Sequence, residues 1–217
     1  MEKNGKVFDS LSALSTRNNL ETVHRLMLHF APVRTLEIGL AFGGSALVFA
    51  GSHKALGHRA KRQHVAIDPH QRTVWDSCGL MALDRAVLSD FVDFHEQSSA
   101  LALPQLLQAG ASFGFVYIDG SHIFEDVFVD TYYAIRLLTR GGIVAFDDST
   151  NLHVAKVLKF LRGSIRGGLE EMDLIPFRGQ RTTLSYRFAR AVGKVQLTVF
   201  RRVGEVERAW NVPFVSF

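Results

Sequence analysis

The sequence predicts an α/β fold, a doubly wound and mostly parallel sheet of seven strands that ends in a C-terminal antiparallel hairpin. Short apolar runs alternate with helical periodicities through the first 161 residues, which is typical of parallel strands joined by crossover helices. After residue 168, two strand-like segments follow one another with no helix expected between them, which favours an antiparallel pair at the sheet edge. We expect one domain over residues 1–217, with an N-terminal helical cap at 1–33 and a terminal β-hairpin and tail at 169–217.

Each expected element follows from a local pattern. A leading helix at 18–30 carries apolar residues on one side, namely Leu20, Val23, Leu26 and Met27. Five apolar runs are interpreted as the parallel strands, at 34–38, 64–67, 91–95, 115–118 and 143–146. The helices expected between and after them cover 45–55, 79–88, 100–108, 124–138 and 152–161. The two glycines of Arg140-Gly-Gly142 are a typical signal for the end of the helix at 124–138. The last two strands, 169–176 and 194–202, are joined by a long loop at 177–193.

The composition limits the functional classes. No apolar run approaches the roughly 18 residues that a membrane span requires, and the first 15 residues are too polar for a secretory signal. Cys78 is the single cysteine, so no intrachain disulfide can form and a cytoplasmic protein is expected. The net charge of +4, from 25 basic and 21 acidic residues, is too small to require a nucleic-acid partner.

The segment from Thr35 to Ser45, Thr-Leu-Glu-Ile-Gly-Leu-Ala-Phe-Gly-Gly-Ser, is the most informative motif. An apolar strand carries Glu37 near its end, Gly39 and Gly43 frame a tight turn, and Ser45 opens a helix. Such a turn lets a ligand approach bare backbone at a helix N-terminus. The spacing differs from the Gly-x-Gly-x-x-Gly of dinucleotide dehydrogenases, which argues against a nicotinamide cofactor. An ordinary glycine turn with a helix-capping serine is the alternative interpretation.

Carboxylates end two strands that are expected to be neighbours. Asp119 follows the strand at 115–118, and Asp147 and Asp148 follow the strand at 143–146. Because adjacent strands lie about 4.8 Å apart, these side chains can converge on one ion, and an all-oxygen set suits Mg²⁺, or Ca²⁺ or Mn²⁺. Two other uses remain open, capping of the helix at 152–161 and a place in a metal-free cofactor pocket.

Together these motifs resemble class I S-adenosylmethionine (SAM)-dependent methyltransferases, particularly the small-molecule O-methyltransferases of the catechol type. The Ile-Asp-x-x-His pattern at 118–122 with the paired acids is also similar to metal-dependent sugar and macrolide O-methyltransferases and the cephalosporin-hydroxylase-like group. The resemblance covers most of the chain and implies a Rossmann-like, seven-stranded sheet. It further implies Mg²⁺-dependent methyl transfer from SAM to a hydroxyl group of a small molecule, such as a sugar, a phenol or another secondary metabolite. Two alternatives remain, a metal-independent small-molecule methyltransferase and a catalytically inactive SAM-binding regulatory protein.

The resemblance also implies roles for single residues. The cofactor-binding residues it implies are Glu37, Gly39, Gly43, Ser45, Asp68, Gln97, Ser99 and Asp119. Among these, Asp68 ends the second strand, where a carboxylate can accept hydrogen bonds from both ribose hydroxyls. Ser99 falls in register with a serine that relatives place against the adenine, whereas Gln97 stands where many of them have glycine. The metal ligands implied are Asp119, Asp147 and Asp148, with an Asp-Asp pair where catechol-type enzymes have Asp-Asn.

His122 is the candidate general base, beside Asp119 in the catalytic set. Catechol-type relatives carry a catalytic lysine three residues after the first aspartate, the offset that His122 occupies. Histidine ordinarily titrates near pH 6.5, which suits removal of a proton from a hydroxyl at neutral pH. A histidine that caps the next helix, or that orients Asp119, is the alternative.

The expected partner is a small hydroxylated molecule. The Asn/Asp-Pro-Pro-aromatic motif of amino-directed nucleic-acid methyltransferases is absent from the sequence. The segment 177–193 is rich in arginine and aromatic residues, which suits an anionic or carbohydrate-like substrate, a partner subunit in a homo-oligomer, or a solvated loop. The cap at 1–33 is expected to cover the methionine end of the cofactor.

Overall fold

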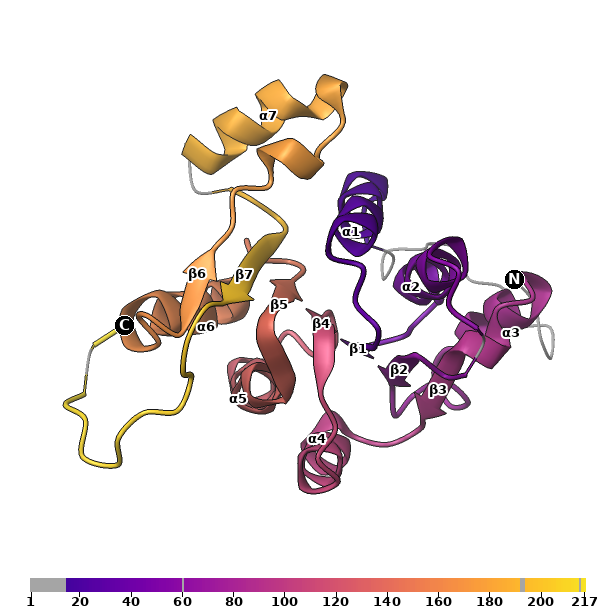
Figure 1. Cartoon of the computed structure of the whole chain (residues 1–217), viewed down its shortest axis with the longest axis horizontal. Coiled ribbons are helices and arrows are strands. Elements are labelled where there is room, and N and C mark those ends of the chain that lie inside the picture. The colour runs from indigo at the N-terminus through magenta and orange to yellow at the C-terminus, as the bar shows by residue number, and fades with distance from the viewer. Residues whose placement is uncertain (1–14, 60, 192–193, 215) are drawn as a thin grey trace.

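The computed structural model describes residues 15–59, 61–191, 194–214 and 216–217, so the first 14 residues of the expected N-terminal cap lie outside the described part. Seven strands form one sheet in the order β3-β2-β1-β4-β5-β7-β6 (Figure 1). Their bounds are β1 Thr35–Ile38, β2 His64–Ile67, β3 Val92–His95, β4 Phe113–Ile118, β5 Leu138–Phe146, β6 Leu169–Glu171 and β7 Thr198–Arg202. Strands β1 to β5 run parallel, while β7 pairs antiparallel with both β5 and β6. The predicted α/β class, with its antiparallel C-terminal strands, is confirmed.

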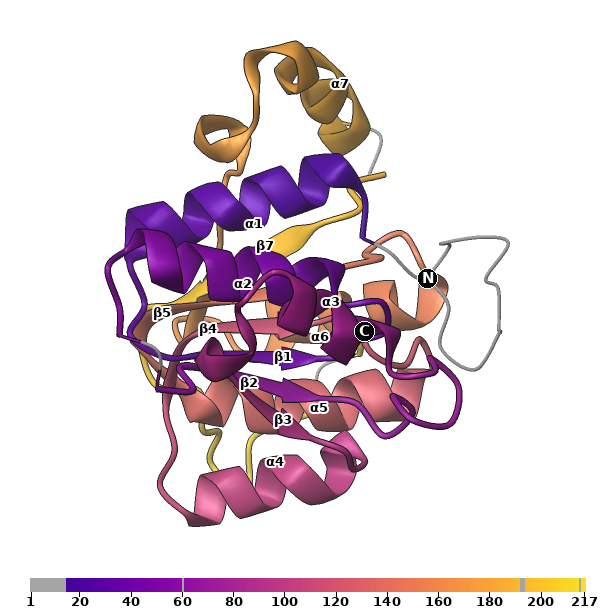
Figure 2. The ribbon, with the colours of Figure 1, turned by 90° about the vertical axis from the view of Figure 1, so that its right-hand side faces the viewer.

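Helices cover both faces of the sheet (Figures 1 and 2). One face carries α1 Arg17–Phe30, α2 Gly44–Ala55 and α3 Cys78–Arg85, and the other carries α4 Ser99–Gln108, α5 Phe124–Leu137 and α6 Leu152–Ser164. Two short 3-10 helices, η1 Ser89–Phe91 and η2 Ile175–Phe177, complete the connections, and α7 Gln180–Ala191 lies above α1 at the top of Figure 2. The chain order reverses between β1 and β4, and an open sheet binds its ligands at the carboxyl ends of the strands beside such a switch point.

Alternate residues of the central strands build two cores. Leu36 and Val116 face a core shared with α4, α5 and α6. Phe115 and Tyr117, their neighbours in the pleat, face the core under α1 and α2, where Phe49 of α2 packs against both rings. The central strands are buried on both faces, which fixes the ends of β1 and β4 in place.

The expectation of a helix-free connection between the last two strands is wrong. Helix α7 occupies most of the segment expected to be a loop, and β6 ends at Glu171 rather than at residue 176. Tyr186 anchors this helix, because its buried side chain belongs to the same apolar cluster as Leu174 and the guanidinium group of Arg178 lies 4.3 Å from its ring centre.

The helix stop expected at Gly141 and Gly142 is also wrong. Helix α5 passes directly into β5 at Leu138, and both glycines lie inside the strand. The pairing of β5 with β4 shifts register in this region, and Gly141 has a φ of +82°. The glycines therefore accommodate a strand irregularity instead of ending a helix. No helix in the described residues is long and apolar enough to cross a membrane.

Candidate active site

A cavity of about 740 Å³ opens at the carboxyl ends of the parallel strands. The predicted site residues that line it are Gly39, Asp68, Ser99, Asp119, His122, Asp147 and Asp148. Glu37, Gly43, Ser45 and Gln97 are not among the residues that line this cavity. The cavity thus brings together most of the predicted site residues, which follow different strands in the sequence. None of the described residues of 177–191 lines it.

Gly39 allows the ends of β1 and β4 to meet. Its φ is +95°, and a Cβ atom added there would lie 2.2 Å from the backbone oxygen of Asp119. The backbone N–H of Asp119 donates to the carbonyl oxygen of Ile38 at 2.9 Å. Only glycine fits this close approach, which holds Asp119 at the cavity wall.

Gly43 and Ser45 lie just behind the wall. Gly43 precedes α2 with a φ of +80°, and a Cβ atom there would lie 2.9 Å from the backbone oxygen of Gly79. Gly43 therefore allows the starts of α2 and α3 to pack closely. Ser45 is buried in the first turn of α2.

Glu37 belongs to a buried polar chain under α2. Its Oε1 lies 3.2 Å from Nε2 of His64, and both side chains are fully buried. The hydroxyl of Thr35 lies 2.8 Å from Nδ1 of His64 and 2.8 Å from Nε2 of His53, whose Nδ1 lies 2.8 Å from Nδ1 of His58. Burial, with the nearby charges of His64 and His58, lowers the pKa of His53 from 6.5 to about 3.

Asp68 fixes the turn that follows β1. Its Oδ2 accepts hydrogen bonds from the N–H groups of Leu40 and Ala41, at 3.1 and 2.8 Å, and its Oδ1 accepts one from the N–H of His70 at 2.7 Å. The carboxylate is 3 % exposed and reaches the cavity from the end of β2. Asp68 therefore combines a structural role with a position on the cavity wall.

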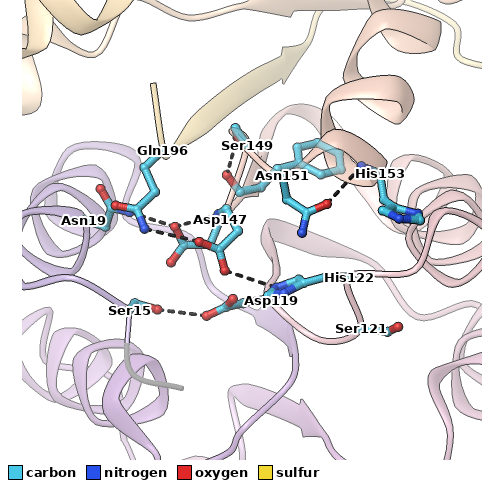
Figure 3. A network of polar contacts seen from close by, with 12 residues as sticks. Ser15, Asn19, Asp119, Ser121, His122, Asp147, Ser149, Asn151, His153 and Gln196 are labelled. Carbon is cyan, nitrogen blue, oxygen red and sulfur yellow. Dashed lines mark hydrogen bonds and ion pairs between the residues drawn. The ribbon is translucent and has the colours of Figure 1, made fainter. Parts of the chain in front are cut away.

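Asp119, His122 and Asp148 converge at the cavity, and Figure 3 shows Asp119 and His122 side by side. One ligating atom from each of them lies within 4.8 Å of those of the other two. Nε2 of His122 is 3.1 Å from Oδ2 of Asp148, and Gln196 donates to Oδ1 of Asp148 at 3.2 Å. Ser15 donates to Oδ2 of Asp119 at 2.8 Å.

Asp147 turns away from this group, toward α1. Asn19 donates to its Oδ1 at 2.7 Å, and the hydroxyl of Tyr117 donates to its Oδ2 at 2.7 Å. The backbone N–H of Asp148 also donates to Oδ1, at 3.0 Å. The side chains that converge are therefore two of the three predicted aspartates together with His122, while Asp147 stands behind them.

Burial and, after it, the nearby negative charges raise pKa values in this part of the cavity. Burial, followed by the charge of Asp147, raises the pKa of Asp119 well above its usual range. Burial also raises the pKa of Tyr117, and the charges of Asp119 and Asp147 add to this effect. Positive charge brought between these carboxylates would relieve the repulsion.

Sequence reasoning missed Ser15, Asn19, Tyr117 and Gln196, which hold the aspartates. Asn19 gives a usable signal, because it lies on the buried face of α1 in line with Val23 and Leu26. A polar residue in an otherwise apolar stripe requires a partner, and its partner is Asp147.

Ser99 and Gln97 mark the start of α4. Ser99 lies on the cavity wall, and its hydroxyl hydrogen-bonds the carboxylate of Asp130 on α5. The side chain of Gln97 donates to Gln105 at 3.3 Å, within its own segment. Of these two predicted residues, Ser99 is the one at the cavity.

Comparisons with known proteins agree with this fold. A family model described as a methyltransferase domain matches residues 36–149, which include every predicted site residue. A search of curated proteins found no match.

Solved structures share the fold. The O-methyltransferase TomG from Streptomyces achromogenes, in complex with SAM, is 18% identical with a TM-score of 0.67, over 90% of this chain and 84% of that one. An O-methyltransferase from Bacillus cereus, in complex with SAH, is 16% identical with a TM-score of 0.62, over 74% and 75% of the two chains. The SAH-bound Podospora anserina methyltransferase PaMTH1 is 16% identical with a TM-score of 0.59, over 90% and 82%.

Proposed function

We propose that the chain, which belongs to the methyltransferase-domain family matched by its residues 36–149, transfers a methyl group from SAM to a hydroxyl group of a small molecule. The observation that carries this proposal is the cavity at the carboxyl ends of the parallel strands. Gly39, Asp68 and Ser99 line it, and so does a second set made of Asp119, His122 and Asp148. A cofactor bound along the first set would present its reactive end to the second.

Three features support SAM as the donor. Gly39 gives bare backbone beside the cavity, and Asp68 offers a carboxylate to the ribose hydroxyls. Ser99, which also lines the cavity, would lie against the adenine. Glu37, Gly43, Ser45 and Gln97 would act indirectly, by shaping the β1–α2 turn and the start of α4.

His122 is the proposed general base. In the transfer, the acceptor oxygen forms a bond to the methyl carbon as the carbon–sulfur bond breaks, and the sulfur keeps the bonding pair as a neutral thioether. The proton of the acceptor hydroxyl passes to His122. Because Nε2 of His122 contacts Asp148, Nδ1 is the nitrogen that would take this proton.

The carboxylates of Asp119 and Asp148 suit a divalent cation. Asp119 and Asp148 supply oxygen donors, with Asp147 behind them, and the pKa of Asp119 is raised by its burial and, after that, by the charge of Asp147. This donor set suits Mg²⁺ or Mn²⁺. A bound cation supplies positive charge that favours loss of the proton from a nearby hydroxyl.

Calorimetry with SAM and its demethylated product, S-adenosylhomocysteine (SAH), tests the proposal. Both should bind in the micromolar range, about −8 kcal/mol, and raise the melting temperature, whereas NAD should not bind. Asp68→Ala should weaken both by tenfold or more, because it removes a ribose acceptor and frees the N–H groups of Leu40 and Ala41. Glu125→Ala, which removes an exposed acid outside the cavity, is the control. Absence of SAM binding by the wild-type protein would refute the proposed function.

A further inference from the structure

Asp130 is a buried acid on the cavity wall that the proposed chemistry does not use. It lies on α5, two turns beyond the start of the helix, and is 1 % exposed. Its Oδ1 has no hydrogen-bond partner among the described residues. A buried carboxylate oxygen without a hydrogen bond destabilises the folded protein. Asp130 therefore calls for a donor that the described residues do not supply.

The start of α4 supplies polar groups close to Asp130. Ser99, the first residue of this ten-residue helix, hydrogen-bonds the Asp130 carboxylate. The N–H groups of its first residues, Ser99 and Ala100, lack intrahelical acceptors, and no side chain in the described part of the chain caps the helix. Both residues line the cavity together with Asp130. One wall therefore offers N–H donors and an unpaired carboxylate oxygen within the same region.

The same cavity also has apolar lining residues. Ile67, Trp75, Ile123 and Val129 line it. A planar ring with a hydrogen-bond donor and an acceptor on one edge matches such a wall. Adenine is such a ring, since its 6-amino group donates and its neighbouring ring nitrogen N1 accepts.

We propose that Asp130 recognises the adenine of the cofactor, its Oδ1 accepting a hydrogen bond from the 6-amino group while an N–H group at the start of α4 faces a ring nitrogen. The inference rests on the proposed function, because it assigns a further residue to the same SAM site. It makes Asp130 a specificity residue for a 6-aminopurine, located on the helix that follows the catalytic loop.

Charge supports the direction of this hydrogen bond. Burial raises the pKa of Asp130 to about 6, with the nearby Asp126 adding to the rise and the Ser99 hydrogen bond opposing it. At pH 7.5 the carboxylate is mostly ionised and can only accept hydrogen bonds. Its partner must therefore be a donor, which the 6-amino group provides.

Calorimetry at pH 7.5 with two ligands tests the proposal. One is SAH, and the other is its purine analogue with hydrogen in place of the 6-amino group. Wild-type protein should bind the analogue at least tenfold more weakly, because the Asp130 oxygen then stays unpaired. In Asp130→Ala the two ligands should bind within about threefold of each other, whereas Asp130→Asn, which keeps an acceptor oxygen, should retain part of the preference. Glu125→Ala, an exposed acid on the same helix, should keep the wild-type ratio.

The outcomes separate the two proposals. If wild-type protein binds neither ligand, the proposed function fails. If it binds both equally well, or if Asp130→Ala keeps the full preference for SAH, only the assignment of Asp130 is overturned. The wild-type ratio does not depend on how well any variant folds, and where Asp130→Ala is unstable, Asp130→Asn supplies the comparison that assigns the preference to Asp130.

Discussion

The carboxylate of Asp148 connects opposite walls of the cavity. His122 from the loop after β4 contacts one oxygen at 3.1 Å, and Gln196 from the segment before β7 donates to the other at 3.2 Å. The backbone of Asp148 has a φ of +47°, which a residue other than glycine adopts at some energetic cost. This strain turns Asp148 toward His122 while its neighbour Asp147 points to α1.

Substitution of His122 should lower turnover without affecting the cofactor. We expect His122→Ala to reduce kcat by 10²–10⁴-fold, roughly 3–5 kcal/mol of barrier, because a positioned base is lost. The dissociation constant for SAH should stay within about twofold of wild type. His122→Gln should not restore turnover, since an amide can hydrogen-bond but cannot accept the proton.

The same variants distinguish a base from a metal ligand. If His122 acts mainly by holding a cation, His122→Gln should need more Mg²⁺ and regain near-wild-type kcat when the cation is saturating. A kcat that stays low at saturating Mg²⁺ supports the base assignment. Recovery of kcat would indicate that His122 is a metal ligand and that another residue is the general base.

At the scale of elements, the packing of β1 against β4 sets the position of Asp119. We expect Gly39→Ala to lower the free energy of unfolding by on the order of 3–5 kcal/mol, because it combines a positive φ with a Cβ atom 2.2 Å from the backbone oxygen of Asp119. Gly57→Ala is the matched control, since Gly57 also has a positive φ, +75°, but nothing lies within 4 Å of its added Cβ. It should lose only about 1–2 kcal/mol. Equal losses in denaturant titrations would show that the close approach contributes nothing.

Elements with strong periodicity were predictable from sequence, and the weakly patterned ones were not. The parallel strands are short apolar runs, so β1, β2 and their neighbours lie within two residues of their expected bounds, apart from the early start of β5. Helix α7 has a polar composition and is anchored by the buried Tyr186, while Leu184 and Phe188 are exposed, so its larger apolar residues do not mark one buried face. The two glycines at 141–142 can end a helix or bend a strand, and the pairing of β5 with β4 decides between these.

The positions of the site residues at the strand ends were predictable from the sequence, whereas the orientations of their side chains were not. Sequence places Asp119, Asp147 and Asp148 at one sheet edge, but the orientation of a side chain depends on partners that are distant in sequence. Asn19, which is 128 residues away from Asp147, turns that carboxylate inward. Asp130 went unnoticed for the same reason, because its significance comes from the unpaired oxygen at the cavity wall.

At the scale of the whole molecule, removal of the cation should affect methyl transfer but not cofactor binding. We expect excess EDTA to abolish methyl transfer while the affinity for SAH changes by less than about threefold, because the cofactor contacts proposed for Asp68 and Ser99 do not involve the cation. Asp148→Ala should mimic the chelator, and added Mg²⁺ should restore only the wild-type enzyme. Full turnover in excess EDTA would assign the protein to the metal-independent small-molecule methyltransferases.

Stability toward acid should depend on the buried histidine chain under α2. Because His53 has a pKa of about 3 in the folded protein and 6.5 in the unfolded chain, the unfolded state binds more protons between these values, and stability falls as the pH drops from 6.5 toward 3. The full loss is about 5 kcal/mol, which is a large part of the stability of a typical domain. His53→Gln removes this titration, although it also disturbs the contacts with Thr35 and His58 and should lower stability at neutral pH. Urea titrations at pH 7 and 4.5 should therefore give a pH-dependent loss about 3 kcal/mol smaller in His53→Gln than in wild type. His29→Gln, at an exposed position, should keep the wild-type difference, and an equal difference in all three proteins would mean that His53 is not the group that makes this fold sensitive to acid.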